Sequence, residues 1–461
     1  MQKTLMFAAL LLAGSAAFSV SANPYETRLA NGLRVIVKED HRAPTAVHMV
    51  WYRAGSMDEK DGYSGVAHML EHMMFKGTQK VAGGEFSRIV AETGGRDNAF
   101  TSHDYTAYFQ IVPNTALPQM MALEADRMAN LRLTQQDFAS ELKVVMEERR
   151  LRTEDNPQSL VWEMLNGTAW LAHPYRRPVI GWMDDLEHMT WQDARDWYQS
   201  WYAPNNAYLL VVGDVDHAKV FSDAARTYGK IKPRALPVRK PQNEPEQTGV
   251  KRVAVKAPAK LPYLALAWKV PRLQDVDQDQ EPYALSVLAA VLDGNDAARF
   301  ARRLVREQKI AQSAGAGYEE IVRGESLFVL DGQPAEGRTV AELETALRGE
   351  LTRIAEEGVA EEELARIKTQ LIASQVYKRD SMMAQAMEIG RFEAAGFSWR
   401  DYDKVLDKMR AVTAAEVQAV AKKYFGPDSD DRLTIAVLDP QPIDESQPRK
   451  KSGGAARHPA Q

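Results

Sequence analysis

The sequence predicts an α+β protein of two homologous domains, each a mostly antiparallel sheet covered by helices. Strand-like apolar runs alternate with long amphipathic helical stretches. The same order of elements occurs on both sides of a segment rich in proline and polar residues. The chain has 461 residues, 45% of them hydrophobic, which is enough for more than one core. We therefore expect an N-terminal domain at 23–235, a linker at 236–248 and a C-terminal repeat at 249–444.

The first 22 residues are typical of a secretory signal peptide. Lys3 precedes an apolar run from Leu5 to about Ala17, and the small residues after it end in a plausible cleavage site at Ala22. The run is shorter than the roughly 20 residues that a membrane span needs. We expect a periplasmic protein without a stable membrane anchor, and secretion outside the cell is the alternative. Residues 445–461 are expected to be a disordered tail.

Alternating and apolar patterns place the elements of the N-terminal domain. Strands are expected at "GLRVIVKED", "AVHMVWYRAGS" and "AYLLVVGDVD", and one further strand along "NAFTSHDYTAYFQIV". A helix is expected from Ser64 to about Phe75, and helical stretches from about Leu117 to Thr153.

The C-terminal domain repeats this order. Strands are expected at "RVAVKAP", "YLALAWKVP", "SLFVLDGQP" and "RLTIAVLDP". Helices are expected at "PYALSVLAAVLDG", where Gly294 stops the helix, and at two long stretches with charged outer faces, "VAELETALRGELTRIAEEG" and "EEELARIKTQLIASQVYKRD".

The charge and cysteine content exclude several classes of function. The chain has 58 basic and 63 acidic residues and a formal net charge of −5, so no basic excess favours nucleic-acid binding. It has no cysteine, so a metal site has to use histidines and carboxylates.

The motif His68-Met-Leu-Glu71-His72 is the sharpest chemical signal. On a helix, residues four apart differ by roughly 40° around the axis, so both imidazoles project from one face. That spacing suits two nitrogen ligands of one zinc ion. Glu71 leans to the same side and can act on the water that the metal binds. This is the inverted form of the zinc peptidase helix motif. Two ordinary histidines on an amphipathic helix are the alternative.

A zinc peptidase site needs a third protein ligand. The stretch "SELKVVMEERRLR" offers Glu141, Glu147 and Glu148. Residues seven apart lie within roughly 20° of each other on a helix, so Glu141 and Glu148 share a face and Glu147 points elsewhere. One of the pair can bind the metal while the other supports a histidine. Helical geometry alone does not choose between them.

These motifs resemble the pitrilysin/insulinase family of inverted zinc metallopeptidases, in the subgroup similar to mitochondrial processing peptidase. The matching stretches include "NGLRVIV", "GVAHMLEHMMFKGT", "GGRDNAFTSHDYTAYF", "ELKVVMEERR" and "YAPNNAYLLVVGDVD". The resemblance implies one Zn²⁺ per chain, bound by His68, His72 and Glu148, with Glu141 behind a histidine. It also implies that peptide substrate adds to the edge strand at Asn98, Ala99 and Phe100. A buried core position is the alternative for Phe100.

One departure from the family concerns the C-terminal half. Members that work as a single chain usually carry an Arg and, seven residues later, a Tyr. Arg306 matches the Arg, but the Tyr position holds Ser313, or Gln312 with a gap. The resemblance therefore favours a heterodimer with a related subunit that lacks the zinc ligands, and a homodimer is possible. For Arg306 itself, substrate contact and a structural ion pair are equally expected.

Together these features predict a zinc metalloendopeptidase that hydrolyses peptides or unfolded polypeptides, with Glu71 as the general base. A non-catalytic assembly subunit is the second hypothesis. A metal-binding or chaperone-like protein is the third.

Overall fold

The computed structural model describes residues 23–443, so the expected signal peptide at 1–22 and tail at 445–461 lie outside the described residues. The strands are β1 (Tyr25–Arg28), β2 (Arg34–Glu39), β3 (Thr45–Tyr52), β4 (Arg96–Thr101), β5 (Thr106–Pro113), β6 (Ala207–Gly213), β7 (Lys251–Pro258), β8 (Tyr263–Val270), β9 (Ala311–Tyr318), β10 (Ser326–Pro334) and β11 (Leu433–Gln441).

These strands form two sheets with the same topology. The first has the order β1-β2-β6-β3-β5-β4 and the second β7-β11-β8-β10-β9. Each sheet contains one parallel pair, β2 with β6 and β7 with β11, and its other pairs are antiparallel. Apart from β1, the two orders correspond strand by strand. The predicted fold class, two similar and mostly antiparallel sheets covered by helices, is confirmed.

Helices cover both sheets. They are α1 (Val66–Met73), α2 (Glu85–Glu92), α3 (Leu117–Asn130), α4 (Gln135–Arg149), α5 (Pro157–Ala169), α6 (Met183–His188), α7 (Trp191–Trp201), α8 (His217–Arg226), α9 (Glu281–Asp293), α10 (Val340–Glu357), α11 (Glu361–Lys378), α12 (Met382–Ala395), α13 (Tyr402–Ala411) and α14 (Ala414–Phe425). No helix in the described range 23–443 combines the length and apolarity needed to cross a membrane.

Some expected elements were wrong in detail. The single strand expected along "NAFTSHDYTAYFQIV" is a hairpin of β4 and β5, because the Ser102 hydroxyl accepts the backbone N–H groups of Asp104 and Tyr105 and closes a turn. The helical stretches expected from about Leu117 to Thr153 are present as α3 and α4, and the Thr134 side chain caps α4 by accepting the N–H of Asp137. Strand β9, rich in glycine and alanine, was not expected at all.

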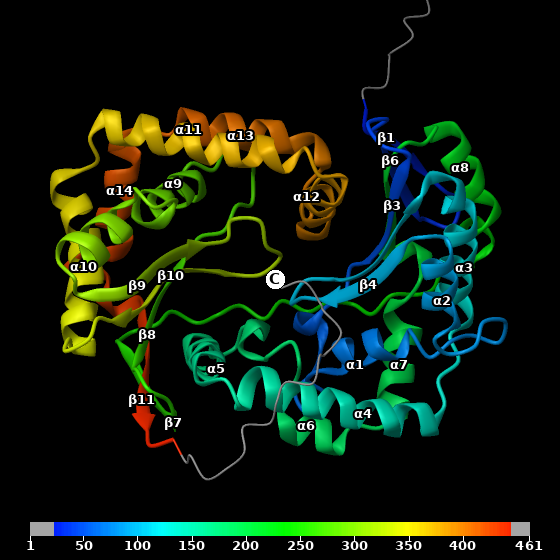
Figure 1. Cartoon of the computed structure of the whole chain (residues 1–461), viewed down its shortest axis with the longest axis horizontal. Helices are drawn as coiled ribbons and strands as arrows, with labels where there is room; N and C mark the ends of the chain where they lie inside the picture. Colours follow the sequence, from blue (N-terminus) through cyan, green and yellow to red (C-terminus); the bar gives the residue numbers. More distant parts are fainter. Residues whose placement is uncertain (1–22, 444–461) are drawn as a thin grey trace, which may run out of the picture.

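The two halves exchange one helix each (Figure 1). Helix α5 comes from the first half, yet its Val161 and Leu165 pack on alanines of the second sheet. Helix α12 comes from the second half and covers β3 and β6, where the Tyr208 hydroxyl donates to the Gly390 carbonyl at 2.6 Å. Each sheet therefore needs the other half to complete the cover of one face. The segment 236–248 that joins the halves contains no helix or strand.

Candidate active site

Helix α1 presents its two histidines towards α4. The helix buries Ala67, Leu70 and Met73 completely in the core beneath the first sheet. The same helical periodicity leaves His68 and His72 half-buried on the other side, with their side chains 12% exposed. The sequence therefore sorts the apolar residues into the core and the imidazoles towards the neighbouring helix.

Glu148 of α4 meets both histidines. Its Oε2 lies 3.2 Å from Nε2 of His72 and 3.8 Å from Nε2 of His68. One ligand atom from each of the three residues lies within 4.8 Å of the others. Around a tetrahedral zinc with bonds of about 2.0–2.1 Å, ligand atoms are roughly 3.3 Å apart. The structure thus brings together the three side chains that the family resemblance implies as ligands, at a spacing that fits zinc.

Glu141 holds His72 from the other side of its ring. Its Oε1 lies 3.0 Å from Nδ1 of His72. Nε2 of His72 is buried and faces Oε2 of Glu148. A metal-binding histidine needs Nδ1–H held by a partner and the Nε2 lone pair left to the metal, and a carboxylate beside Nδ1 favours that tautomer. Glu147 instead pairs with Arg150 at 3.2 Å, so the expected sorting of the three glutamates is observed.

The carboxylate of Glu71 is buried beside this group. The Thr101 hydroxyl donates to its Oε2 at 2.5 Å. Burial raises the pKa of Glu71 to about 7, against the opposing effects of the Thr101 hydrogen bond and the nearby His72. A carboxylate with a pKa near neutrality is suited to accept and return a proton.

Three polar neighbours of this site were missed from the sequence. Thr101 binds Glu71 from the end of β4, Lys76 forms an ion pair with Glu141, and Arg152 lies 2.9 Å from Glu148. The i,i+4 spacing from Glu148 could have indicated Arg152. Burial raises the pKa of Glu148, but the His72 hydrogen bond and nearby positive charges outweigh it and hold the pKa at about 2. The group is therefore a carboxylate at neutral pH.

The residues expected to bind substrate lie in two places. Strand β4 pairs only with β5, so its outer backbone edge is the edge of the first sheet. On it Asn98 and Phe100 are half-buried and Ala99 is buried, and the Phe100 ring lies 5.6 Å from that of Trp51. Arg306 is exposed and makes no hydrogen bond or ion pair with residues of the described range. The structural ion pair considered for Arg306 is therefore not formed with any residue of the described range.

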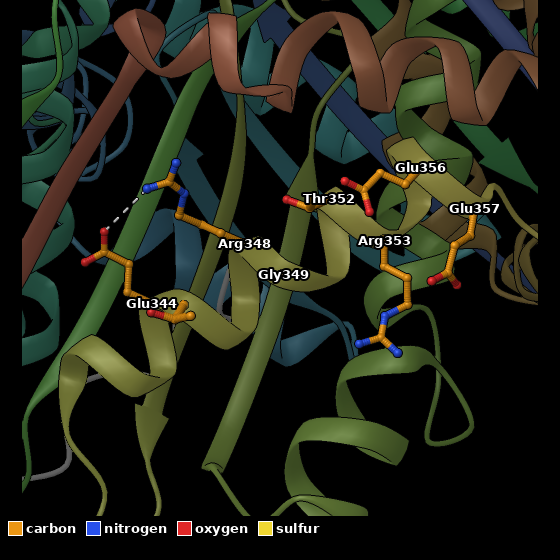
Figure 2. Close-up of a pocket in the computed structure, with 8 residues that line it drawn as sticks. Glu344, Arg348, Gly349, Thr352, Arg353, Glu356 and Glu357 are labelled. Atoms are coloured by element: carbon orange, nitrogen blue, oxygen red, sulfur yellow. Dashed lines mark ion pairs between the residues drawn. The ribbon is translucent and has the colours of Figure 1, made fainter.

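Two other regions are weaker candidates for the active site. Within residues 23–443, a second metal-capable group joins Glu39, Asp216 and His217. It lies at the N-terminus of α8, where the helix dipole opposes a cation. A surface hollow along α10 is lined by charged side chains, two threonines and Gly349, with Arg348 and Glu344 paired at 3.9 Å (Figure 2). It contains no histidine and belongs to the other half of the chain.

Comparison with known proteins finds two matching family models and several similar chains. A family model described as insulinase (peptidase family M16) matches residues 34–182, and one described as peptidase M16 inactive domain matches 188–371. The chain is 35% identical to the zinc protease PqqE of Helicobacter pylori over 338 residues, 70% of this chain and 75% of that protein. It is 27% identical to an uncharacterized zinc protease of Streptomyces coelicolor, covering 90% and 89% of the two chains.

A solved protease structure has a similar fold. The crystal structure of a protease from Helicobacter pylori superposes with a TM-score of 0.85 at 29% identity, covering 90% of this chain and all of that one. The fold, the two matched family models and the 35% identical relative lead to one conclusion: this chain belongs to the insulinase family of peptidases, family M16.

Proposed function

We propose that this chain is a zinc-dependent endopeptidase that hydrolyses peptides or unfolded polypeptides. The convergence of Glu148 on His68 and His72, beside the buried carboxylate of Glu71, carries the proposal. The related Helicobacter pylori protein is named a zinc protease, which supports the same activity here.

Each residue has a separate task in the proposed reaction. His68, His72 and Glu148 hold one zinc, which when bound supplies a Lewis acid that polarises the scissile carbonyl and acidifies water. Glu141 orients His72 through its Nδ1–H. Glu71 accepts a proton from the attacking water and passes it to the nitrogen of the leaving amine. Thr101 orients the Glu71 carboxylate between these two transfers.

The proposed substrate is an extended peptide paired with the free edge of β4. Backbone groups at Asn98 and Ala99 would bind it largely without regard to sequence, with Phe100 beside them. Because Thr101 at the end of the same strand donates to Glu71, a peptide lying along β4 would be directed towards the general base. Strand pairing of this kind accepts unfolded chains and excludes folded ones.

We further propose that the enzyme works in the periplasm, or outside the cell, with a second subunit. The apolar N-terminal run supports export. Exposed Arg306, which has no partner in the described range, supports a role for this arginine towards substrate. Since the tyrosine expected after it is replaced, a related chain without zinc ligands would supply the missing contact. A second copy of this chain is the alternative.

Metal content and peptide cleavage test the proposal together. The mature chain is purified, its zinc is quantified, and cleavage of a quenched peptide mixture is followed with and without a chelator. Zinc near one per chain and chelator-sensitive cleavage are expected. Zinc binding without cleavage, alone and with a candidate partner subunit, would leave a metal-binding or chaperone-like protein. Absence of both would leave a non-catalytic subunit.

A further inference from the structure

The start of helix α1 rests on a turn that lies far from it in sequence. Gly65, which precedes α1, and Gly181 lie with their backbones in contact. A Cβ added at Gly181 would lie 2.4 Å from the Ser64 carbonyl oxygen, and one added at Gly65 would lie 2.6 Å from the Ile180 carbonyl oxygen. Both glycines have φ of +88°. The position of α1 is therefore set by the position of this turn.

Two side-chain carboxyl groups, of buried Glu59 and half-buried Asp185, hold the same end of α1. Helix α1 has no side-chain cap of its own at Gly65. Glu59 accepts the backbone N–H groups of Gly65 at 3.1 Å and Ala67 at 2.9 Å. Asp185, four residues beyond Gly181, accepts both the N–H and the hydroxyl of Ser64. The first turn of the helix that carries His68 and His72 is thus attached to fixed groups.

Arg149 connects this turn to α4. It directly follows Glu148, so its side chain leaves the helix about 100° away from the metal-facing side. It is only 5% exposed. Its Nη1 donates to the Gly181 carbonyl at 2.8 Å, and Nη1 and Nη2 donate to the Glu163 carboxylate of α5 at 2.8 and 3.0 Å. The guanidinium therefore connects α4, which carries Glu148, to the turn at Gly181. That turn contacts the start of α1, the helix that carries His68 and His72.

We propose that Arg149 is a positioning residue for the metal site. By holding the Gly181 carbonyl, it fixes the turn under α1 and so sets the separation between the helix of Glu148 and the helix of His68 and His72. The inference rests on the proposed function, since it assumes that these three residues bind zinc. Arg149 touches neither metal nor substrate in this role. Its effect appears as metal affinity and as kcat, with little change in KM.

The second half of the chain supplies a matched control. Arg299 is 4% exposed, binds Glu363 at 2.8 and 3.1 Å, and donates to the Gly358 carbonyl at 3.4 Å. It is as buried and as bonded as Arg149, but its partners belong to the C-terminal half. Arg149→Met and Arg299→Met each remove a buried guanidinium of the same kind, and both are expected to lower the Tm of the metal-free protein.

Zinc affinity separates the two variants. It is measured by competition with a chromophoric chelator at 25 °C, well below either Tm. Arg149→Met should weaken zinc binding about 10- to 100-fold, the effect of removing outer support from metal ligands. It should lower kcat with KM nearly unchanged. Arg299→Met should bind zinc as the wild type does. Equal zinc affinities in the two variants would overturn the proposal.

A milder variant keeps the test decisive if Arg149→Met does not fold. In Arg149→Lys the ammonium group keeps the ion pair with the Glu163 carboxylate. It lacks the planar guanidinium that also donates to the Gly181 carbonyl. A loss of zinc affinity of several-fold supports the proposal, and wild-type affinity overturns it. A wild-type protein that binds no zinc would overturn the proposed function itself. Tight zinc binding by wild type and Arg149 variants alike would overturn only the positioning role.

Discussion

The hydroxyl of Thr101 donates to the carboxylate of Glu71 at 2.5 Å, which joins the edge strand β4 to helix α1. Thr101→Val keeps the shape but removes the donor, so the carboxylate loses its orientation. We expect kcat/KM to fall about 10-fold, the order of one hydrogen bond to a charged group, while zinc affinity stays unchanged. Thr106→Val, opposite in the same hairpin and bonded to the Ala54 carbonyl, is the control. An equal fall of kcat/KM in the two variants would contradict a specific role of Thr101 in orienting Glu71.

Replacement of the proposed base separates metal binding from chemistry. Glu71→Gln retains the volume but cannot accept the proton from water. We expect hydrolysis to fall by about 10²- to 10⁴-fold, the usual contribution of a general base. The zinc content should be that of the wild type, because Glu71 is not among the three converging ligands. Turnover is measured on the quenched peptide mixture and zinc by atomic absorption. Wild-type turnover in this variant would rule out the mechanism.

The three glutamates of α4 should behave differently although they lie within eight residues. Glu148→Gln should abolish tight zinc binding. Glu141→Gln should weaken it about 10- to 100-fold, because His72 loses the carboxylate on its Nδ1. Glu147→Gln should leave it unchanged, since this side chain pairs with Arg150. Chelator competition on the three variants gives the ranking. A Glu147 variant as weak as the Glu141 variant would contradict it.

The candidate metal-binding group could be predicted largely from the sequence because the spacing of its residues follows helical periodicity. The four-residue spacing of His68 and His72 and the seven-residue spacing of Glu141 and Glu148 each fix a helix face. The choice of Glu148 over Glu141 came only from the family resemblance; in the structure Glu148 faces Nε2 of both histidines and Glu141 contacts Nδ1 of His72. The repeated order of strands and helices also predicted the fold class.

Contacts between distant segments could not be predicted in this way. Thr101 reaches Glu71 only because β4 and β5 form a hairpin, and the turn depends on the Ser102 hydroxyl rather than on any apolar pattern. The attachment of Arg149 to Gly181 has no periodic signal. The exchange of α5 and α12 was also invisible, since an apolar helix face does not state which sheet it covers.

Glu244, in the segment 236–248 that joins the two halves, should stabilise the folded protein in a pH-dependent way. Burial raises its pKa, but Lys269 and the backbone N–H groups of Leu171, Ala172 and His173 outweigh this and lower the pKa to about 2, from an ordinary 4.5. Between these values the unfolded chain binds a proton that the folded chain does not. The stabilisation is therefore complete above about pH 4.5 and is lost as the pH falls towards 2.

Urea unfolding at several pH values tests this sign. The free energy of unfolding of Glu244→Gln should fall below that of the wild type at pH 7, and the gap should narrow at pH 3. Glu246→Gln, at an exposed neighbouring position, is the control and should follow the wild type throughout. A gap that widens on acidification would show that the carboxylate is not stabilised in the folded state.

Replacing two helical glycines by alanine should change the free energy of unfolding in opposite directions. Only one of them lies where α12 packs on the first sheet. A Cβ at Gly390 of α12 would lie 2.1 Å from the ring of Trp51 in β3, whereas one at Gly349 of α10 meets nothing within 4 Å. Alanine favours a helix over glycine by about 0.5–1 kcal/mol. We expect Gly349→Ala to raise the free energy of unfolding by about that amount. Gly390→Ala should lower it by about 1–3 kcal/mol, the cost of overpacking a well-packed core.

Urea unfolding of both variants shows whether α12 packs tightly or loosely on β3. If α12 rested loosely on β3, it could shift to admit the methyl group, and both substitutions would then stabilise the protein equally. The tight contact predicts opposite signs. It also predicts loss of the 2.6 Å hydrogen bond from the Tyr208 hydroxyl to the carbonyl of residue 390 in Gly390→Ala. Tyr208→Phe should then destabilise the wild type more than it destabilises Gly390→Ala, because that variant no longer has the bond to lose.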